Sequence, residues 1–322
     1  MLLFLALVSA FAPNAAVAAE CTDTWTGPTE GSWSTASNWS AGHVPGESDV
    51  ACIGSGKTAK LTAAGLNIVQ GVEGAGTVYL RESTLKIEGT AETWQLGALR
   101  MAYGANLTGP GSLEVQSTLV WEDESTMSGN GKTILGAGSS STLTSFYPIL
   151  THRTLVNNGT LTLEEQARIR ASEEALLENN GTINANTTAA YGREPGIVTD
   201  TGVVPPELVN NGTIRKASAS EYFHLALNVE NTGTIKAENG AFRYDAPWAI
   251  VTLTPGSVLE GTNRFVGSGV VADDFLMPSG ILKARESPIV VEGLNSKVSK
   301  LEVDYGTVLT GPGDLEVSDE FL

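Results

Sequence analysis

A short phrase ending in Gly-Thr returns four times in the middle of the chain, and this repetition limits the fold more than any other feature. Its glycines are Gly159, Gly181, Gly212 and Gly233, which are 22, 31 and 21 residues apart. A unit of about 22 residues is too short to bury its own apolar face, whereas stacked units bury a continuous core. The repetition therefore predicts a solenoid of stacked coils.

Turn-forming asparagines precede these glycines, namely Asn158, Asn180, Asn211 and Asn231. Asparagine and glycine both tolerate positive φ angles, so the pair predicts a turn, and the Thr-Leu or Thr-Ile that follows begins a strand. Identical turn residues on successive coils can stack, each side-chain amide bonding to the next. We therefore expect an asparagine ladder along one corner of the solenoid.

The segments between turns have the period-2 alternation of half-buried strands. Leu85 and Ile87 alternate with polar residues, as do Leu113 and Val115. About 22 residues accommodate three short strands and three bends, the size of one turn of a parallel β-helix. The sequence predicts an all-β chain folded as a parallel β-helix, or β-solenoid, with about 22 residues per coil.

The stretch from Leu163 to Asn179 is rich in Glu, Ala, Leu and Arg, which are good helix formers. It lies between two copies of the repeat, however, and Ala167, Ile169 and Ala171 alternate along it. We predict strands here, because packing against neighbouring coils overrides local propensity.

Two further features modify the repeat. The long interval contains residues 192–206, and a loop of about nine residues inserted there restores the period. Leu107 to Val115 matches Leu309 to Val317 at an offset of 202 residues, which indicates either a second, longer repeat or one turn type used twice. Nothing polar caps the last copy, so we expect further coils or domains of a longer chain after it.

The first 19 residues have the features of a secretory signal peptide. Met1 to Ala12 are almost wholly apolar, and small residues precede a cleavage point after Ala18 or Ala19, although no Lys or Arg precedes the run. The alternative, a membrane anchor, is too short to span about 30 Å of hydrocarbon. We expect a secreted chain whose mature part does not insert into a membrane.

The chain has two cysteines, Cys21 and Cys52. Export permits a disulfide, and two thiols allow only one intramolecular pairing. Such a bridge closes about 30 residues and stabilises the fold by roughly 3 kcal/mol. The alternative is two free thiols. There is no CxxC spacing that would indicate metal or redox chemistry.

Residues 20–56 form a distinct segment that holds Trp25, Trp33 and Trp39. Indoles at this density can line a sugar-binding face or cap a core. We favour the cap, because an open first coil would expose a strand edge and an apolar cross-section. The β-helix repeats then occupy residues 57–322.

The chain resembles a family in two sets of motifs. The resemblance rests on Trp25-Thr26-Gly27, Trp33, Asn38-Trp39, Pro45-Gly46 and Asp49 to Ile53, and on the L-x-G-x-G-x-L-x-V, Trp121 to Gly131 and NNGT units. These are similar to the leading segment of secreted bacterial β-solenoid proteins and to the repeats of large adhesin-like surface proteins. The resemblance covers residues 25–317 and implies a right-handed parallel β-helix that is exported and often joined to further modules. It implies no catalytic residues.

Composition argues against several partners. The net charge of −17 disfavours nucleic acid, whose affinity comes largely from Lys and Arg that neutralise phosphates. Residues 54–58 and 129–133 end in GKT, but a phosphate-binding loop needs an earlier glycine where this chain has Ala51 and Thr126. We therefore expect neither nucleic acid nor nucleotide as a partner.

No catalytic or metal constellation stands out. His43, His152 and His224 lack metal-ligand spacing from one another and from cysteine. Asp273-Asp274 is the most suggestive acidic pair, but neighbours on a strand point to opposite faces, and a solvated turn explains both. We expect no catalytic residue, no metal and no cofactor.

The sequence therefore predicts a secreted or cell-surface bacterial module that acts as a rigid spacer or surface-interaction scaffold without catalysis. Its expected partners are surface glycans or other surface proteins. Two alternatives stay open: a polysaccharide lyase or glycosidase on the same scaffold, and passive glycan binding by Trp25, Trp33 and Trp39.

Overall fold

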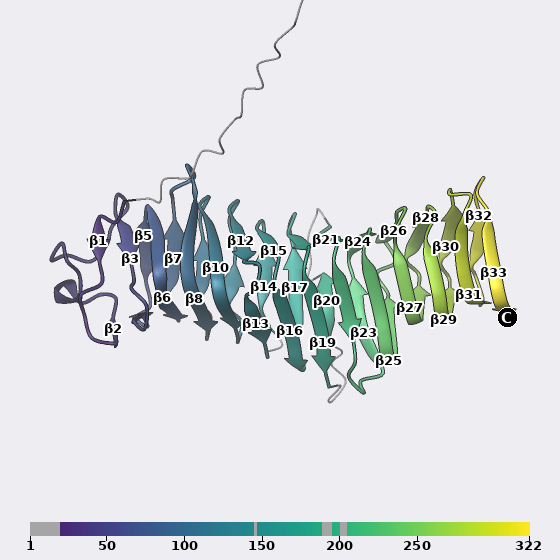
Figure 1. Cartoon of the computed structure of the whole chain (residues 1–322), viewed down its shortest axis with the longest axis horizontal. Helices are drawn as coiled ribbons and strands as arrows, with labels where there is room; N and C mark the ends of the chain where they lie inside the picture. The colour runs from purple at the N-terminus through teal and green to yellow at the C-terminus, as the bar shows by residue number, and fades with distance from the viewer. Residues whose placement is uncertain (1–19, 145–146, 189–194, 200–204) are drawn as a thin grey trace, which may run out of the picture.

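The chain folds into a rod of stacked coils, shown lengthwise in Figure 1. This computed structural model describes residues 20–144, 147–188, 195–199 and 205–322, so the expected signal peptide and parts of the inserted segment lie outside the described residues. About 60% of the chain is strand, wound into about 12 turns at a spacing of roughly 21 residues. The predicted all-β parallel solenoid is confirmed, with a coil slightly shorter than the repeat suggested.

The strands stack in three parallel sheets, here called faces 1, 2 and 3. Face 1 consists of β1 (Asp23–Thr24), β3 (Val50–Cys52), the first parts of β6 (Gly71–Arg81), β8 (Thr93–Ala102) and β10 (Ser112–Trp121), then β12 (Lys132–Leu135), β15 (Thr154–Asn157), β18 (Leu176–Asn179), β21 (Glu207–Asn210), β24 (Asn228–Asn231), β26 (Ile250–Leu253), β28 (Gly269–Ala272), β30 (Pro288–Val291) and β32 (Val308–Thr310).

The other two faces follow in the same order along the rod. Face 2 consists of β2 (Glu30–Ser32), β4 (Thr58–Leu61), the second parts of β6, β8 and β10, then β13 (Ser140–Leu143), β16 (Thr160–Glu165), β19 (Thr182–Thr187), β22 (Thr213–Lys216) and the first parts of β25 (Thr234–Tyr244), β27 (Val258–Val266), β29 (Leu276–Arg285), β31 (Ser296–Val303) and β33 (Leu315–Phe321). Face 3 consists of β5 (Leu66–Val69), β7 (Thr84–Ile87), β9 (Asn106–Thr108), β11 (Thr126–Met127), β14 (Ile149–Thr151), β17 (Arg168–Ser172), β20 (Gly196–Thr199), β23 (Tyr222–Ala226) and the second parts of β25, β27, β29, β31 and β33.

Alternating side chains fill the interior and form columns along the rod. On face 2, Leu161, Ile183, Ile214 and Ile235 occupy equivalent positions on consecutive coils, and each is fully buried. Polar or small residues on either side of each point outward, as the pleat requires. The apolar core therefore runs continuously from coil to coil.

The helix-prone stretch from Leu163 to Asn179 is extended. It contains the end of β16, all of β17 and all of β18, and Ala167, Ile169 and Ala171 are buried. The prediction of strands is confirmed. Backbone pairing with coils on both sides outweighs the helix propensity of its glutamates and alanines.

The two matching segments at the 202-residue offset lie on different faces. Leu107 belongs to β9 on face 3 and leads into β10 on face 1, whereas Leu309 belongs to β32 on face 1 and leads into β33 on face 2. The match therefore reflects one corner sequence used at two different corners, and the interpretation as a longer repeat is wrong.

The Asn-Gly corners have a backbone that differs from our prediction. None of the glycines at positions 159, 181, 212 and 233 has a φ in the left-handed region. A Cβ on Gly181 would instead lie 2.1 Å from the carbonyl oxygen of Gly159, and one on Gly212 would lie 2.1 Å from that of Gly181. These corners therefore need glycine because each passes directly over the corner of the previous coil, leaving no room for a Cβ. They do not need it for a positive φ angle.

The N-terminal segment continues the same stack. β3 pairs with β6, and β2 pairs with β4, so strands on both sides of position 56 belong to shared sheets. Among the described residues the only helix is the three-residue 3₁₀ turn η1 (Ala36–Asn38), and no helix there is long and apolar enough to cross a bilayer.

We predict that Gly181→Ala lowers the free energy of unfolding by about 1–3 kcal/mol, the usual cost of overpacking a close contact. Chemical denaturation measures the effect. Gly54→Ala is the matched control, because a Cβ at Gly54 meets no atom within 4 Å, and its effect should stay within about 0.5 kcal/mol. Equal stability of the two variants would contradict the close-approach explanation.

Candidate functional site

A buried ladder of asparagine amides runs along the corner between faces 1 and 2. The Nδ2 atom of Asn157 donates to Oδ1 of Asn179 at 2.7 Å, Asn179 donates to Asn210 at 2.7 Å, and Asn210 donates to Asn231 at 2.6 Å. All four side chains are fully buried. An amide carries both a donor and an acceptor, so stacked copies satisfy one another.

A second, exposed ladder lies beside it, one residue further along the chain. Asn180 donates to Asn158 at 3.0 Å, Asn211 donates to Asn180 at 2.9 Å, and the hydroxyl of Thr232 donates to Asn211 at 2.8 Å. The predicted stacking of Asn158, Asn180 and Asn211 is therefore present. Asn231, however, belongs to the buried ladder, and Thr232 takes its expected place.

The buried ladder also crosses the long interval of the repeat without interruption. Asn179 and Asn210 are 31 residues apart, yet their amides meet at the same 2.7 Å as those of Asn157 and Asn179. The strand within this interval, β20, lies on face 3 and pairs in register with β17 and β23. The insertion therefore leaves the coil register unchanged, as the sequence predicts.

The three tryptophans of the N-terminal segment form one buried cluster. The ring centroids of Trp25 and Trp39 are 5.0 Å apart and those of Trp33 and Trp39 are 4.7 Å apart, both in edge-to-face arrangements. The indole of Trp39 donates to the carbonyl of Trp33, and that of Trp25 to the carbonyl of Pro28. Each residue is at most 4% exposed, so none offers a ring face on which a sugar could stack, and the role of the cluster as a cap stays a prediction.

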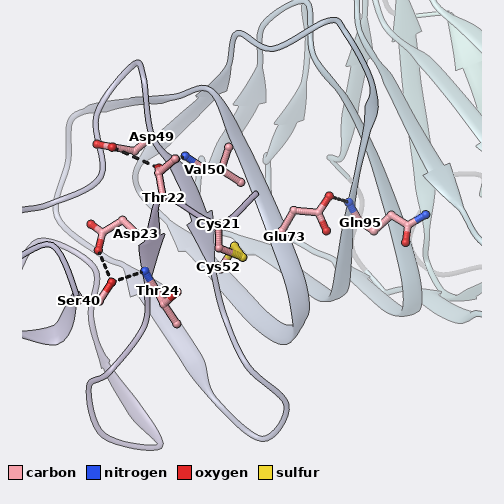
Figure 2. Close-up of a disulfide and its surroundings, with 10 residues drawn as sticks. All are labelled: Cys21, Thr22, Asp23, Thr24, Ser40, Asp49, Val50, Cys52, Glu73 and Gln95. Atoms are coloured by element: carbon pink, nitrogen blue, oxygen red, sulfur yellow. Dashed lines mark hydrogen bonds between the residues drawn. A yellow bond between two sulfur atoms is a disulfide. The ribbon is translucent and has the colours of Figure 1, made fainter. Parts of the chain in front are cut away.

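The predicted disulfide between Cys21 and Cys52 is present (Figure 2). It ties Cys21, two residues before β1, to Cys52 at the end of β3, with 5.8 Å between the Cα atoms. Hydrogen bonds flank it: Val50 N donates to the Thr22 hydroxyl and Thr24 N to the Ser40 hydroxyl, both at 2.8 Å. Glu73 lies beside the bridge in Figure 2, and burial raises the pKa of its carboxyl.

The other residues singled out in the sequence lie at coil corners. Asp274 has a left-handed φ of 49° and accepts a hydrogen bond from Asn295 N at 2.8 Å, so it shapes a turn against the next coil. The two GKT segments lead into β4 and β12, whereas a phosphate loop leads into a helix. In the described ranges, no three His, Cys, Asp or Glu side chains converge as a metal site would require.

The histidines are far apart along the chain and differ in setting. The ring of His43 contacts Asp49 at 3.1 Å on the surface, and this hydrogen bond raises the pKa of His43. His152 is an exposed corner residue with a φ of 53°. His224 is buried on face 3, with Nδ1 2.9 Å from a carboxylate oxygen of Asp245.

Two buried cations fill corners where stacked backbones leave carbonyls unpaired, and sequence reasoning missed both. The guanidinium of Arg153 donates to the carbonyls of Gly109, Ser128, Gly111 and Lys132 and to the Thr133 hydroxyl. The ammonium of Lys216 donates to the carbonyls of Ser218, Ser220 and Asn239. Burial lowers the pKa of Arg153 to about 10 and that of Lys216 to about 8. Neither residue stands in a repeated motif that would reveal it.

No protein-family model, curated protein or solved structure was found to match this chain.

We predict that Asn179→Ala lowers the free energy of unfolding by about 2–3 kcal/mol, because it leaves a buried donor and a buried acceptor of the ladder without partners. Chemical denaturation measures it. The control, Asn180→Ala, removes two equivalent bonds from the exposed ladder, where water replaces them, and should cost less than about 1 kcal/mol. Equal losses would show that burial of the inner ladder is energetically unimportant.

We also predict a pH dependence that arises from Lys216. The pKa of Lys216 is about 8 in the folded chain and 10.5 ordinarily. Between these two pH values the Lys216 side chain is therefore more protonated in the unfolded chain than in the native chain. The contribution of Lys216 to the free energy of unfolding therefore rises with pH through this window. The difference in denaturation midpoint between the wild type and Lys216→Met isolates it, and a difference that is flat from pH 7 to 10.5 would contradict the assignment.

Proposed function

We propose that this chain is a rigid, non-catalytic spacer and interaction scaffold that works outside the cytoplasm, on a bacterial surface or in a matrix. The observation that carries the proposal is the unbroken stack of coils, in which one apolar core and one buried amide ladder continue through successive turns.

Stiffness along the rod supports a spacer. Each inner strand forms backbone hydrogen bonds with the coil before it and the coil after it. Ion pairs between side chains on adjacent coils add further contacts along the rod. Arg100 pairs with Glu122 at 3.1 Å, Arg215 with Glu238 at 2.6 Å, and Lys236 with Glu260 at 3.1 Å. Each exposed pair contributes little by itself, but together they oppose bending and sliding of one coil over the next.

The disulfide supports a place outside the cytoplasm, because such bonds persist in oxidising compartments and are rare where glutathione keeps thiols reduced. The excess of acidic over basic residues, 36 to 19, would keep parallel rods apart by repulsion. Both features suit a protein that stands in a crowded envelope or matrix and presents its faces to surface glycans or other surface proteins.

The acidic side chains support a role without catalysis. The most suggestive pair, Asp273 and Asp274, takes part in a corner turn, and face 2 carboxylates pair with cations on adjacent coils. A glycosidase would instead place two free carboxylates about 5–10 Å apart in a groove.

We predict that the chain scatters X-rays in solution as a rod about 60 Å long, from about 12 coils at about 4.8 Å each. Incubation with a panel of polysaccharides should release neither reducing ends nor unsaturated sugars. A compact particle would overturn the spacer, and robust turnover of any polysaccharide would overturn the non-catalytic role.

A further inference from the structure

Cations stack directly upon one another on the outer surface of face 3, in the coils labelled β25 to β29 in Figure 1. Arg243 of β25 pairs in register with Arg264 of β27, and Arg264 pairs with Lys283 of β29. Like charges directly opposite one another on paired strands are destabilising. A protein with a net charge of −17 thus concentrates its few cations where they repel one another.

Arg243 and Lys283, on either side of Arg264, each have one carboxylate partner, whereas Arg264 has none among the described residues. Arg243 Nε lies 3.3 Å from Asp245, and Lys283 Nζ lies 2.6 Å from Glu302. Arg264 between them donates to the hydroxyl of Tyr222 at 3.1 Å. Over the part of the chain that the structure describes, no carboxylate lies within ion-pair distance of Arg264. Its positive charge is therefore available to an external anion.

Tyr222 reaches Arg264 because the intervening position is small. Tyr222 pairs in register with Ala241, and Ala241 with Thr262, so the phenol can lie along the rod over two coils. The guanidinium carbons of Arg243 and Arg264 lie 5.4 and 6.0 Å from the centre of its ring. The tyrosine thus holds both arginines at the surface and adds an aromatic wall beside them.

Two shallow depressions adjoin this centre and share Arg264 and Lys283. The larger has a volume of about 200 Å³ and is lined by Gly240, Ala241 and Thr262, with Tyr222 and Glu221 beside them. The smaller, of about 70 Å³, continues toward Arg285, Glu302 and Asp304. Their size and openness suit successive units of a chain-like ligand and not an enclosed small molecule.

We propose that Tyr222, Arg264 and Lys283 form a binding site for a linear acidic polysaccharide, with a sugar carboxylate on Arg264 and Lys283 and the sugar ring against Tyr222. Nearby Asp245, Glu302 and Asp304 can accept hydrogen bonds from sugar hydroxyls, whereas they would repel the closely spaced phosphates of a nucleic acid. This binding site is independent of the proposed spacer role, because a rod without affinity for polysaccharide could still act as a spacer, and the site could bind polysaccharide on a protein that is not a spacer.

The test measures binding of polygalacturonate to the full chain by calorimetry, with neutral dextran and single-stranded DNA as comparison polymers. We expect binding of polygalacturonate that weakens as salt rises, no binding of dextran, and weaker binding of DNA. Arg264→Gln and Lys283→Gln should each weaken polygalacturonate binding at least tenfold, while Arg264→Lys should retain part of it.

Arg81→Gln is the matched control. Arg81 also lies over a tyrosine, 4.4 Å from the ring centre of Tyr103, but beside Glu82 at another corner, so its loss should leave binding unchanged. Thermal unfolding checks that each variant is folded. No binding by the wild type, equal binding by Arg264→Gln, an equal loss in Arg81→Gln, or equally tight binding of DNA would each overturn the proposal.

Discussion

Hydrogen bonding between successive coils is the constraint on which the rest of this structure depends. Each strand lies in register with its equivalents before and after it, about 4.8 Å away, so every side chain stacks on a counterpart from another turn. A residue is acceptable only if it can lie against that counterpart. Gly181 illustrates the rule, because the carbonyl of Gly159 occupies the space that a Cβ would need.

The same rule separates side chains that can stack on themselves from those that cannot. Leucine and isoleucine stack by apolar contact, and asparagine stacks because its amide both donates and accepts. Cations do not satisfy one another, and the stacked Arg215 and Lys236 each pair with a carboxylate on the next coil. Arg264 departs from this pattern, because it contacts the hydroxyl of Tyr222 instead of a carboxylate, and this departure is the reason we propose a ligand site on face 3.

Local patterns predicted the fold well where the repeat imposed it, and less well where single contacts mattered. The stretch from Leu163 to Asn179 was correctly assigned as strands from its place between repeats. The buried ladder of Asn157, Asn179 and Asn210 was missed because adjacent asparagines look alike in sequence, and only the pleat decides which one points inward. Lys216 was missed because its partners are backbone carbonyls, which leave no trace in a pattern of side chains.

The sequence by itself determined the stacked-coil architecture, the corner that repeats and the single possible disulfide, because each follows from periodicity or from a count of residues. Only the tertiary structure decided that the corner glycines serve close approach, that Leu107 and Leu309 occupy different faces, and that Arg264 faces outward among other cations. These depend on which residues meet across a coil, and small variations in coil length accumulate until spacing in the chain no longer gives position on the rod.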